Sequence, residues 1–141
     1  MELYESMTLN GEGRNVERLG AFVAWLISND LMNPMLVDAS GSSVARVRMQ
    51  DLTGADFLST ILHGDLSPSH LNELGRGFTN SYFVSGQYAE DYAACRYEGE
   101  DEWLRFDEIS PKISAAFRQF NQPKSALREI GAKILKFPSR R

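Results

Sequence analysis

Hydrophobic positions recur at helical spacing over most of the chain, and the first third carries the clearest pattern. Its apolar stripe consists of Leu19, Phe22, Val23, Trp25, Leu26 and Ile27. Steps of three and four residues are typical of an amphipathic helix. Asn15 is placed to cap this helix, while Asn29-Asp30 and Pro34 are placed to end it. The pattern therefore predicts a helix between Asn15 and Asn29.

The next stretch contains one ambiguous segment and one short helix. Residues 43–50 alternate as in a half-buried strand, yet Val44 and Val47 also fit one turn of a helix, so both interpretations stay open. Thr53-Gly-Ala-Asp56 resembles a capping box and predicts a short helix directly after it. Gly64 is placed to end that helix in a left-handed conformation.

Two Ser-Pro pairs predict further helix starts, because serine can cap a helix and proline suits its first position. Ser67-Pro68 would open a helix whose inward side carries Leu71, Leu74, Phe78 and Tyr82. Gly75 and Gly77 within it suggest the close approach of another helix. Ser110-Pro111 would open a second helix whose inward side carries Ile113, Phe117 and Phe120.

Three weaker patterns complete the predicted architecture. After Gly86, a short helix would place Tyr88, Tyr92 and Cys95 on one face. Residues 124–141 predict a basic C-terminal helix, and residues 1–14 an extended N-terminal segment with a hint of alternation. Together the patterns predict a mainly α protein: one compact domain, residues 1–141, of about five or six amphipathic helices with at most minor β structure in the N-terminal part.

Composition narrows the class of protein. The chain has 141 residues, 43% of them hydrophobic, which suits a compact domain rather than a disordered one. No apolar run approaches the roughly 18 residues of a membrane span, and the start lacks the layout of a signal peptide. The lone Cys95 excludes an internal disulfide and a cysteine-rich zinc site. We therefore expect a cytoplasmic protein that does not bind membranes.

The charge is distributed unevenly around a net value of −4. Residues 90–108 carry eight acids against Arg96 and Arg105, whereas residues 124–141 carry six basic residues against Glu129. An acidic surface attracts basic proteins and repels nucleic acid, so we expect a protein partner and no nucleic acid. The alternative is a solvated loop whose charge the basic C-terminal segment compensates.

Candidate catalytic chemistry is sparse. His63, Asp65 and His70 could be imagined as metal ligands, but their spacing matches no standard site, so we expect no metal and no cofactor. Acidic neighbours would raise the pKa of Cys95, which favours a buried apolar role over a nucleophilic one. The acids lie in polar sequence, where solvent keeps them ionised.

Three stretches resemble an uncharacterised bacterial family that is a domain of unknown function. They are Gly20 to Ile27, then Gly64 to Tyr92 with its aromatic positions, and Trp103-Leu-Arg-Phe-Asp107 continuing to Phe117. The resemblance covers about residues 16–120 and departs from the family pattern near the start of the chain. It implies no catalytic residues. Some members of this family occur next to polymorphic toxins, as immunity proteins do. The resemblance therefore implies toxin neutralisation.

These observations predict a non-catalytic binding protein, an immunity protein that occludes a toxin with a basic surface through an acidic face. The expected electrostatic contacts are Glu98, Glu100, Asp101 and Glu102, and the expected aromatic anchors are Tyr97 and Trp103. Two alternatives remain: a small enzyme that uses the carboxylates with His63 or His70, and a general protein-interaction adaptor.

Overall fold

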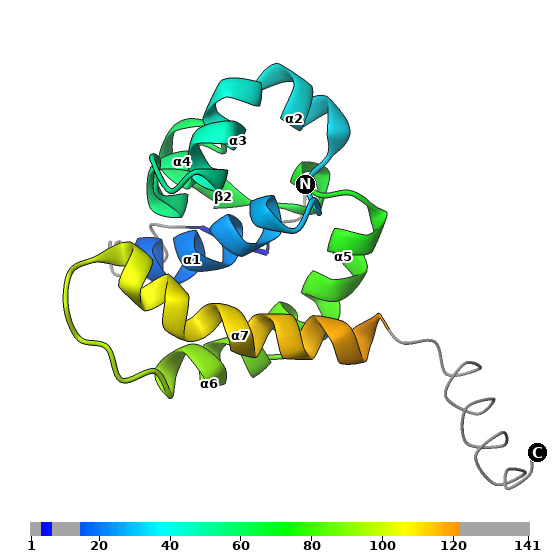
Figure 1. The fold of residues 1–141 in the computed structure, drawn as a ribbon. Coiled ribbons are helices and arrows are strands. Elements are labelled where there is room, and N and C mark those ends of the chain that lie inside the picture. Colours follow the sequence, from blue (N-terminus) through cyan, green and yellow to red (C-terminus); the bar gives the residue numbers. More distant parts are fainter. Residues whose placement is uncertain (1–3, 7–14, 122–141) are drawn as a thin grey trace, which may run out of the picture.

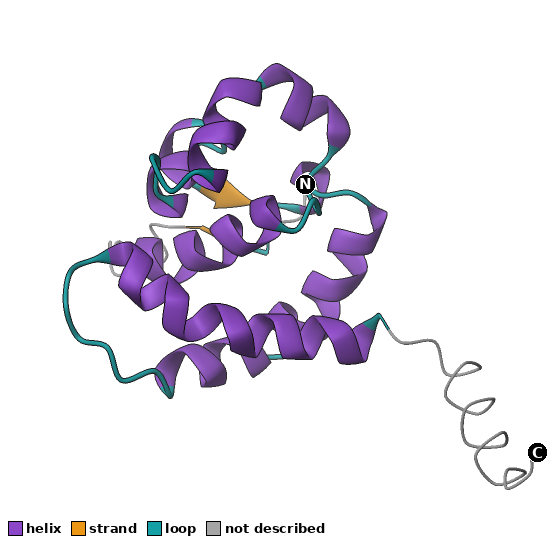
Figure 2. Cartoon of the chain, viewed as in Figure 1, coloured by secondary structure: helices purple, strands orange, loops and turns teal. Residues whose placement is uncertain are grey.

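The computed structural model describes residues 4–6 and 15–121, and this part of the chain is mostly helical (Figures 1 and 2). Its seven α-helices are α1 (Asn15–Ser28), α2 (Pro34–Ala39), α3 (Gly41–Arg48), α4 (Gly54–Thr60), α5 (Glu73–Thr79), α6 (Gln87–Ala93) and α7 (Glu102–Phe120). A 3₁₀ turn, η2 (Pro68–His70), precedes α5, and a π-helical turn, η3 (Asn80–Val84), follows it. The mainly α prediction is confirmed.

The minor β structure consists of two very short strands. β1 (Glu5–Ser6) pairs antiparallel with β2 (Asp65–Leu66), which ties the N-terminal segment to the region after α4. The remainder of the expected extended segment 1–14, apart from Tyr4, lies outside the described residues. So does the expected basic helix 124–141.

The first helix, α1, forms the centre of the core. Residues 19–27 are all buried, so α1 is surrounded by other elements rather than covered on one face. In Figure 1, α2, α3 and α4 lie above α1, while α7 crosses below it. The indole N–H of Trp25 donates to Ser114 Oγ at 3.0 Å, which joins α1 to α7.

Two glycines let α1 and α4 touch through their backbones. A Cβ added at Gly54 would lie 1.9 Å from the carbonyl oxygen of Gly20. A Cβ added at Gly20 would lie 2.6 Å from the backbone nitrogen of Ala55. Real side chains do not tolerate such distances, so this crossing requires glycine at both positions.

A cluster of aromatic rings joins α1 to the second half of the chain. The ring of Phe22 lies 5.0 Å from both Phe83 and Tyr88, and Trp25 meets Phe117 of α7 edge to face at 5.4 Å. These separations are those of favourable aromatic pairs. The burial predicted for the α1 stripe is therefore confirmed.

Several local predictions are also confirmed. The ambiguous segment 43–50 is helical up to Arg48, where α3 ends; α3 buries Val44 and Val47, so the helical interpretation is correct and the strand interpretation is wrong. The Thr53 hydroxyl accepts from the N–H of Asp56 at 3.0 Å and so caps α4. Gly64 adopts the predicted left-handed conformation with φ of 88°, although α4 already ends at Thr60.

The helix start predicted at Ser67-Pro68 is confirmed as the 3₁₀ turn η2, but the single continuous helix predicted after it is wrong. Leu71 lies in an extended bridge with Met32, and Asn72 caps a new helix, α5, by accepting from the N–H of Gly75 at 2.7 Å. Leu71 reaches the core from this extended backbone, whereas Leu74 is 41% exposed. Gly75 does permit a close approach, but to the backbone of Leu31 in the turn after α1. At Gly77 the prediction of another helix is confirmed, because an added Cβ would lie 3.1 Å from the Phe120 ring of α7.

The helix start predicted at Ser110-Pro111 is also wrong. α7 begins at Glu102 and continues through Pro111. Phe106, Ile109 and Ile113 are all buried, so the core-facing stripe extends across the proline. An interior proline costs about 3 kcal/mol, comparable to burying one or two such side chains, and the packing on both sides outweighs it.

Candidate partner-binding site

The acidic loop, residues 94–101, joins α6 to α7 and projects from one end of the fold (Figure 1). The carboxylate of Glu108 accepts hydrogen bonds from the N–H groups of Arg96 and Tyr97, at 2.7 and 2.9 Å. These two bonds lower the pKa of Glu108, because they stabilise its ionised form. At the other end of the loop, the phenol oxygen of Tyr97 accepts from the N–H of Asp101 at 3.0 Å. Hydrogen bonds to the side chains of Glu108 and Tyr97 therefore fix the conformation of the loop backbone.

Arg105 ties the acidic loop to the rest of the fold. Its Nη2 donates to the carbonyl oxygen of Gly99 at 2.5 Å, and its guanidinium lies 5.6 Å from the centre of the Tyr97 ring. Its Nη1 lies 3.5 Å from the carboxylate of Glu17 on α1. Only 11% of the Arg105 side chain is exposed, so its positive charge is engaged inside the structure.

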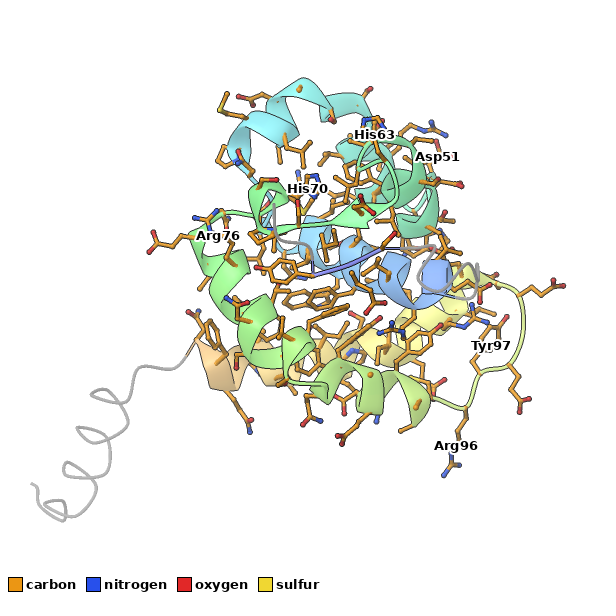
Figure 3. The ribbon with its side chains drawn as sticks, turned by 180° about the vertical axis from the view of Figure 1, so that it is seen from behind. Asp51, His63, His70, Arg76, Arg96 and Tyr97 are labelled. Atoms are coloured by element: carbon orange, nitrogen blue, oxygen red, sulfur yellow. The ribbon has the colours of Figure 1, made fainter. Side chains whose placement is uncertain are left out.

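The carboxylates of the loop remain outside the ion pairs of the described chain. Glu98, Glu100 and Asp101 are exposed, as is Asp107 on the first half of α7. The four ion pairs among residues 4–6 and 15–121 involve other acids, namely Glu5, Glu17, Asp30 and Asp51. Arg96, the cation within the loop, points outward from the fold (Figure 3).

Two of the predicted electrostatic contacts also have roles in the fold. The Asp101 carboxylate caps α7 by accepting from the N–H groups of Trp103 and Leu104, at 2.9 and 3.2 Å. Glu102 is half-buried and accepts from the N–H of Ala55 at 3.2 Å, which links α7 to the start of α4. Burial raises the pKa of Glu102, against the effect of this hydrogen bond.

The two predicted aromatic anchors are half-buried in their own fold. The Tyr97 ring lies beside Arg105 at the edge of the loop (Figure 3), and Trp103 packs edge to face against Phe106 at 5.3 Å. The side chain that offers apolar surface is instead Leu104, which is 52% exposed. The sequence pattern does not indicate this side chain, because the position of Leu104 depends on α7 starting at Glu102.

Tertiary structure extends the acidic surface beyond the loop. Glu17 on α1 and Asp56 on α4 are exposed, and their charges both help to raise the pKa of Glu102. Because Glu17 and Asp56 are distant in sequence from the acidic loop, counting charges along the chain does not place them near it. We define the acidic surface as Glu17, Asp56, Glu98, Glu100, Asp101, Glu102 and Asp107.

The histidines lie away from this surface. His63 is exposed in the turn before β2, and His70 Nδ1 accepts from the N–H of Ser67 at 3.2 Å (Figure 3). Burial lowers the pKa of His70, which favours its neutral form. Within the described residues, no group of three His, Cys, Asp or Glu side chains is arranged to hold a metal ion.

Cys95 is half-buried rather than fully buried, at the junction of α6 and the acidic loop. Burial raises the pKa of its thiol, and the charges of Glu108 and Asp91 raise it further. The predicted direction is therefore confirmed, although Glu108, thirteen residues along the chain, was not among the expected causes. A thiol of raised pKa is a poor nucleophile at neutral pH.

A family model described as "Domain of unknown function (DUF7832)" matches residues 4–104. This range begins earlier and ends sooner than the resemblance over residues 16–120, and it includes the N-terminal residues that were expected to depart from the family. The search found no matching curated protein and no matching solved structure. Among the described residues, none of the helices combines the length and apolar character needed to cross a membrane.

Proposed function

This chain belongs to the DUF7832 family of domains of unknown function, and from that premise we propose that it is a non-catalytic binding protein that captures a basic protein through its acidic surface. The observation that carries the proposal is the loop presenting Glu98, Glu100 and Asp101 to solvent, outside the ion pairs of the described residues. Electrostatic attraction of this kind accelerates association to about 10⁸–10⁹ M⁻¹s⁻¹ at low salt.

The internal bonds of the loop support this function. Glu108, Tyr97 and Arg105 hold the backbone through hydrogen bonds at 2.5–3.0 Å, so the carboxylates project from a fixed frame. A surface that is already ordered loses less conformational entropy on binding. We therefore propose that Tyr97 and Trp103 support the loop from beneath the contact surface, whereas Glu98 and Glu100 contact the partner protein directly.

Leu104 supplies the apolar element that a protein interface needs. Its side chain is 52% exposed, and it lies on α7 between the exposed acids Asp101 and Asp107. Interfaces commonly combine a central apolar contact with a polar rim, and the apolar contact dominates the affinity. Charge would thus govern the approach of the partner, whereas Leu104 would contribute to the stability of the complex.

We propose more specifically that the partner is a bacterial toxin with a basic surface and that the complex forms in the cytoplasm as immunity. The support for this step is the family resemblance described above, in which some members stand beside polymorphic toxins. A toxin that acts on nucleic acid or nucleotides needs a basic cleft, and an acidic surface can occlude such a cleft.

The experiment combines this protein with the product of the adjacent gene and measures binding by interferometry at low and high salt. The test variant carries Glu98→Lys and Glu100→Lys. The matched control carries Asp38→Lys and Glu73→Lys, which change the net charge equally at exposed acids on α2 and α5. We expect the association rate to fall about tenfold or more in the test variant and in high salt. Equal association rates for the two double variants would contradict the assignment.

A growth assay separates immunity from the adaptor alternative. The neighbouring protein is expressed in cells with the wild-type chain, the loop variant or the control variant. Immunity predicts that the wild type and the control restore growth, whereas the loop variant does not. Salt-sensitive binding without any effect on growth would support an adaptor instead.

A further inference from the structure

A groove of about 570 Å³ lies among α5, η3, α6 and α7. It takes side chains from two stretches of the chain, residues 78–91 and 112–120. The residues that define its chemistry are Phe78, Tyr82, Gln87, Asp91, Lys112 and Phe120. Neither the acidic surface nor the histidines contribute to this lining.

The groove contains a positioned carboxylate. The phenol of Tyr82 donates to Asp91 Oδ2 at 2.6 Å, and the amide of Gln87 donates to Asp91 Oδ1 at 3.0 Å. A carboxylate has about four acceptor sites, so each oxygen keeps capacity for a further donor. Within residues 4–6 and 15–121, Asp91 takes part in no ion pair. Burial and the bond to Asp91 both raise the pKa of Tyr82, which therefore remains a donor.

Aromatic rings stand next to this carboxylate. The rings of Phe78 and Tyr82 stack at 5.2 Å, and the Phe120 ring lies 5.7 Å from Phe78. Phe120 is 37% exposed, so part of its ring is open to a ligand. Carboxylate oxygens beside aromatic faces suit a guanidinium, because this planar and weakly hydrated cation can donate to the oxygens while it stacks on a ring.

Lys112, the cation that the described residues contribute to the groove lining, does not favour an anionic ligand. Lys112 is exposed, and its charge acts on Glu108, one helical turn earlier, whose pKa it helps to lower. An anion entering the groove would be repelled by the Asp91 carboxylate. The phenol of Tyr82 and the amide of Gln87 already donate to that carboxylate rather than to a ligand. A cation would meet a fixed acceptor that lacks an ion-pair partner among the described residues.

We propose that this groove binds an arginine side chain of the basic partner protein, with Asp91 as the acceptor and Phe120 as the stacking surface. This inference rests on the proposed function and extends it, because it names the side chain that the partner inserts. The position is suitable: α6 carries Asp91 and leads directly into the acidic loop, so one partner can contact both.

The test uses N-acetyl-arginine amide as the probe and the full chain labelled with nitrogen-15. We expect saturable shifts of the backbone amides at residues 85–91 and 112–120, with a dissociation constant of about 1 mM, as suits a single side chain. The citrulline analogue has a similar shape without the charge and should give shifts at least fivefold weaker. Equal shifts with citrulline, or shifts confined to other residues, would overturn the proposal.

Two variants with the same change in charge locate the contact. Asp91→Asn removes the negative charge of the groove, whereas Glu90→Gln removes the neighbouring exposed negative charge outside the lining. We expect Asp91→Asn to weaken probe binding at least fivefold and Glu90→Gln to leave it unchanged. Equal effects of the two variants would overturn the assignment. The dispersion of the amide spectrum verifies that each variant is folded.

A competing occupant is the chain's own segment 124–141, which carries Arg128, Arg140 and Arg141 and follows Phe120 closely in sequence. If replacing these three arginines by glutamine shifts the groove amides without any probe, that segment fills the groove and the proposal is overturned. The loop variant with Glu98→Lys and Glu100→Lys should bind the probe normally. If the wild-type chain binds the probe but not the partner protein, the proposed function alone is refuted. If it binds the partner protein but not the probe, this inference alone is refuted.

Discussion

The crossing of α1 and α4 gives the strongest prediction for stability. Replacing Gly54 by alanine would place a Cβ 1.9 Å from the carbonyl oxygen of Gly20, where real contacts stay beyond 3.0 Å. The two helices must then separate by about 1 Å or more, since backbone atoms form the contact on the α1 side. α1 cannot move away, because residues 19–27 are buried on every side.

The cost follows from what α4 carries into the core. Phe57 and Leu58 are both 0% exposed, and full burial of each side chain contributes about 1.5–3 kcal/mol. Partial loss of both contacts, together with the strain of overpacking, predicts that Gly54→Ala lowers the free energy of unfolding by about 3 kcal/mol or more. This loss corresponds to a decrease in Tm of about 12 °C for a chain of this size.

Gly41→Ala is the matched control. Gly41 is the first residue of α3, and a Cβ added there meets nothing within 4 Å. Alanine has the higher helix propensity and restricts the unfolded chain, so this change should stabilise the protein by about 0.4–1 kcal/mol. The two variants thus make the same chemical change with opposite expected signs.

Urea denaturation followed by circular dichroism at 222 nm measures both variants. We expect the midpoint to fall for Gly54→Ala and to rise slightly or stay constant for Gly41→Ala, with a similar dependence on urea. If the unfolding free energies of the two variants agree within about 0.5 kcal/mol, the close backbone contact between α1 and α4 does not exist in solution.

Two further predictions concern α7. Pro111→Ala should stabilise the protein by about 1–2 kcal/mol in urea denaturation, because it restores an interior N–H at a modest cost in unfolded-chain entropy; if the helix began at Ser110, the variant would instead be destabilising. The pKa of Glu102 is raised in the folded state, so the folded chain binds more protons and stability falls as the pH rises through the range above the unfolded pKa. Glu102→Gln should therefore gain more stability, relative to wild type, at pH 7 than at pH 4, and a pH-independent difference would contradict this.

Local preferences were sufficient to identify the features that involve neighbours in the chain. The stripe of α1, the Thr53 cap of α4 and the left-handed Gly64 each depend on spacing or on one residue's own conformational freedom. The acidic character of residues 90–108 is likewise a property of composition. For these features the energetic reason is contained within a few consecutive residues.

Features that depend on distant contacts required the tertiary structure. The preference of Ser110-Pro111 for a helix start is worth only a few kcal/mol, and the burial of Phe106, Ile109 and Ile113 against elements far away in sequence outweighs it. The same reasoning applies to the close contact of Gly20 with Gly54, which the sequence does not indicate.

In the candidate site, too, the sequence predicts some features and only the tertiary structure determines the others. Sequence supplied the acids of the loop, but only the fold separated the exposed Glu98 and Glu100 from Glu102, whose carboxylate is engaged at the start of α4. Only the fold placed Asp91 beside Phe120 in one groove. Charge and helical periodicity can be read directly from the order of residues along the chain. The exposure of a carboxylate and its hydrogen-bond partners depend instead on which segments pack against it.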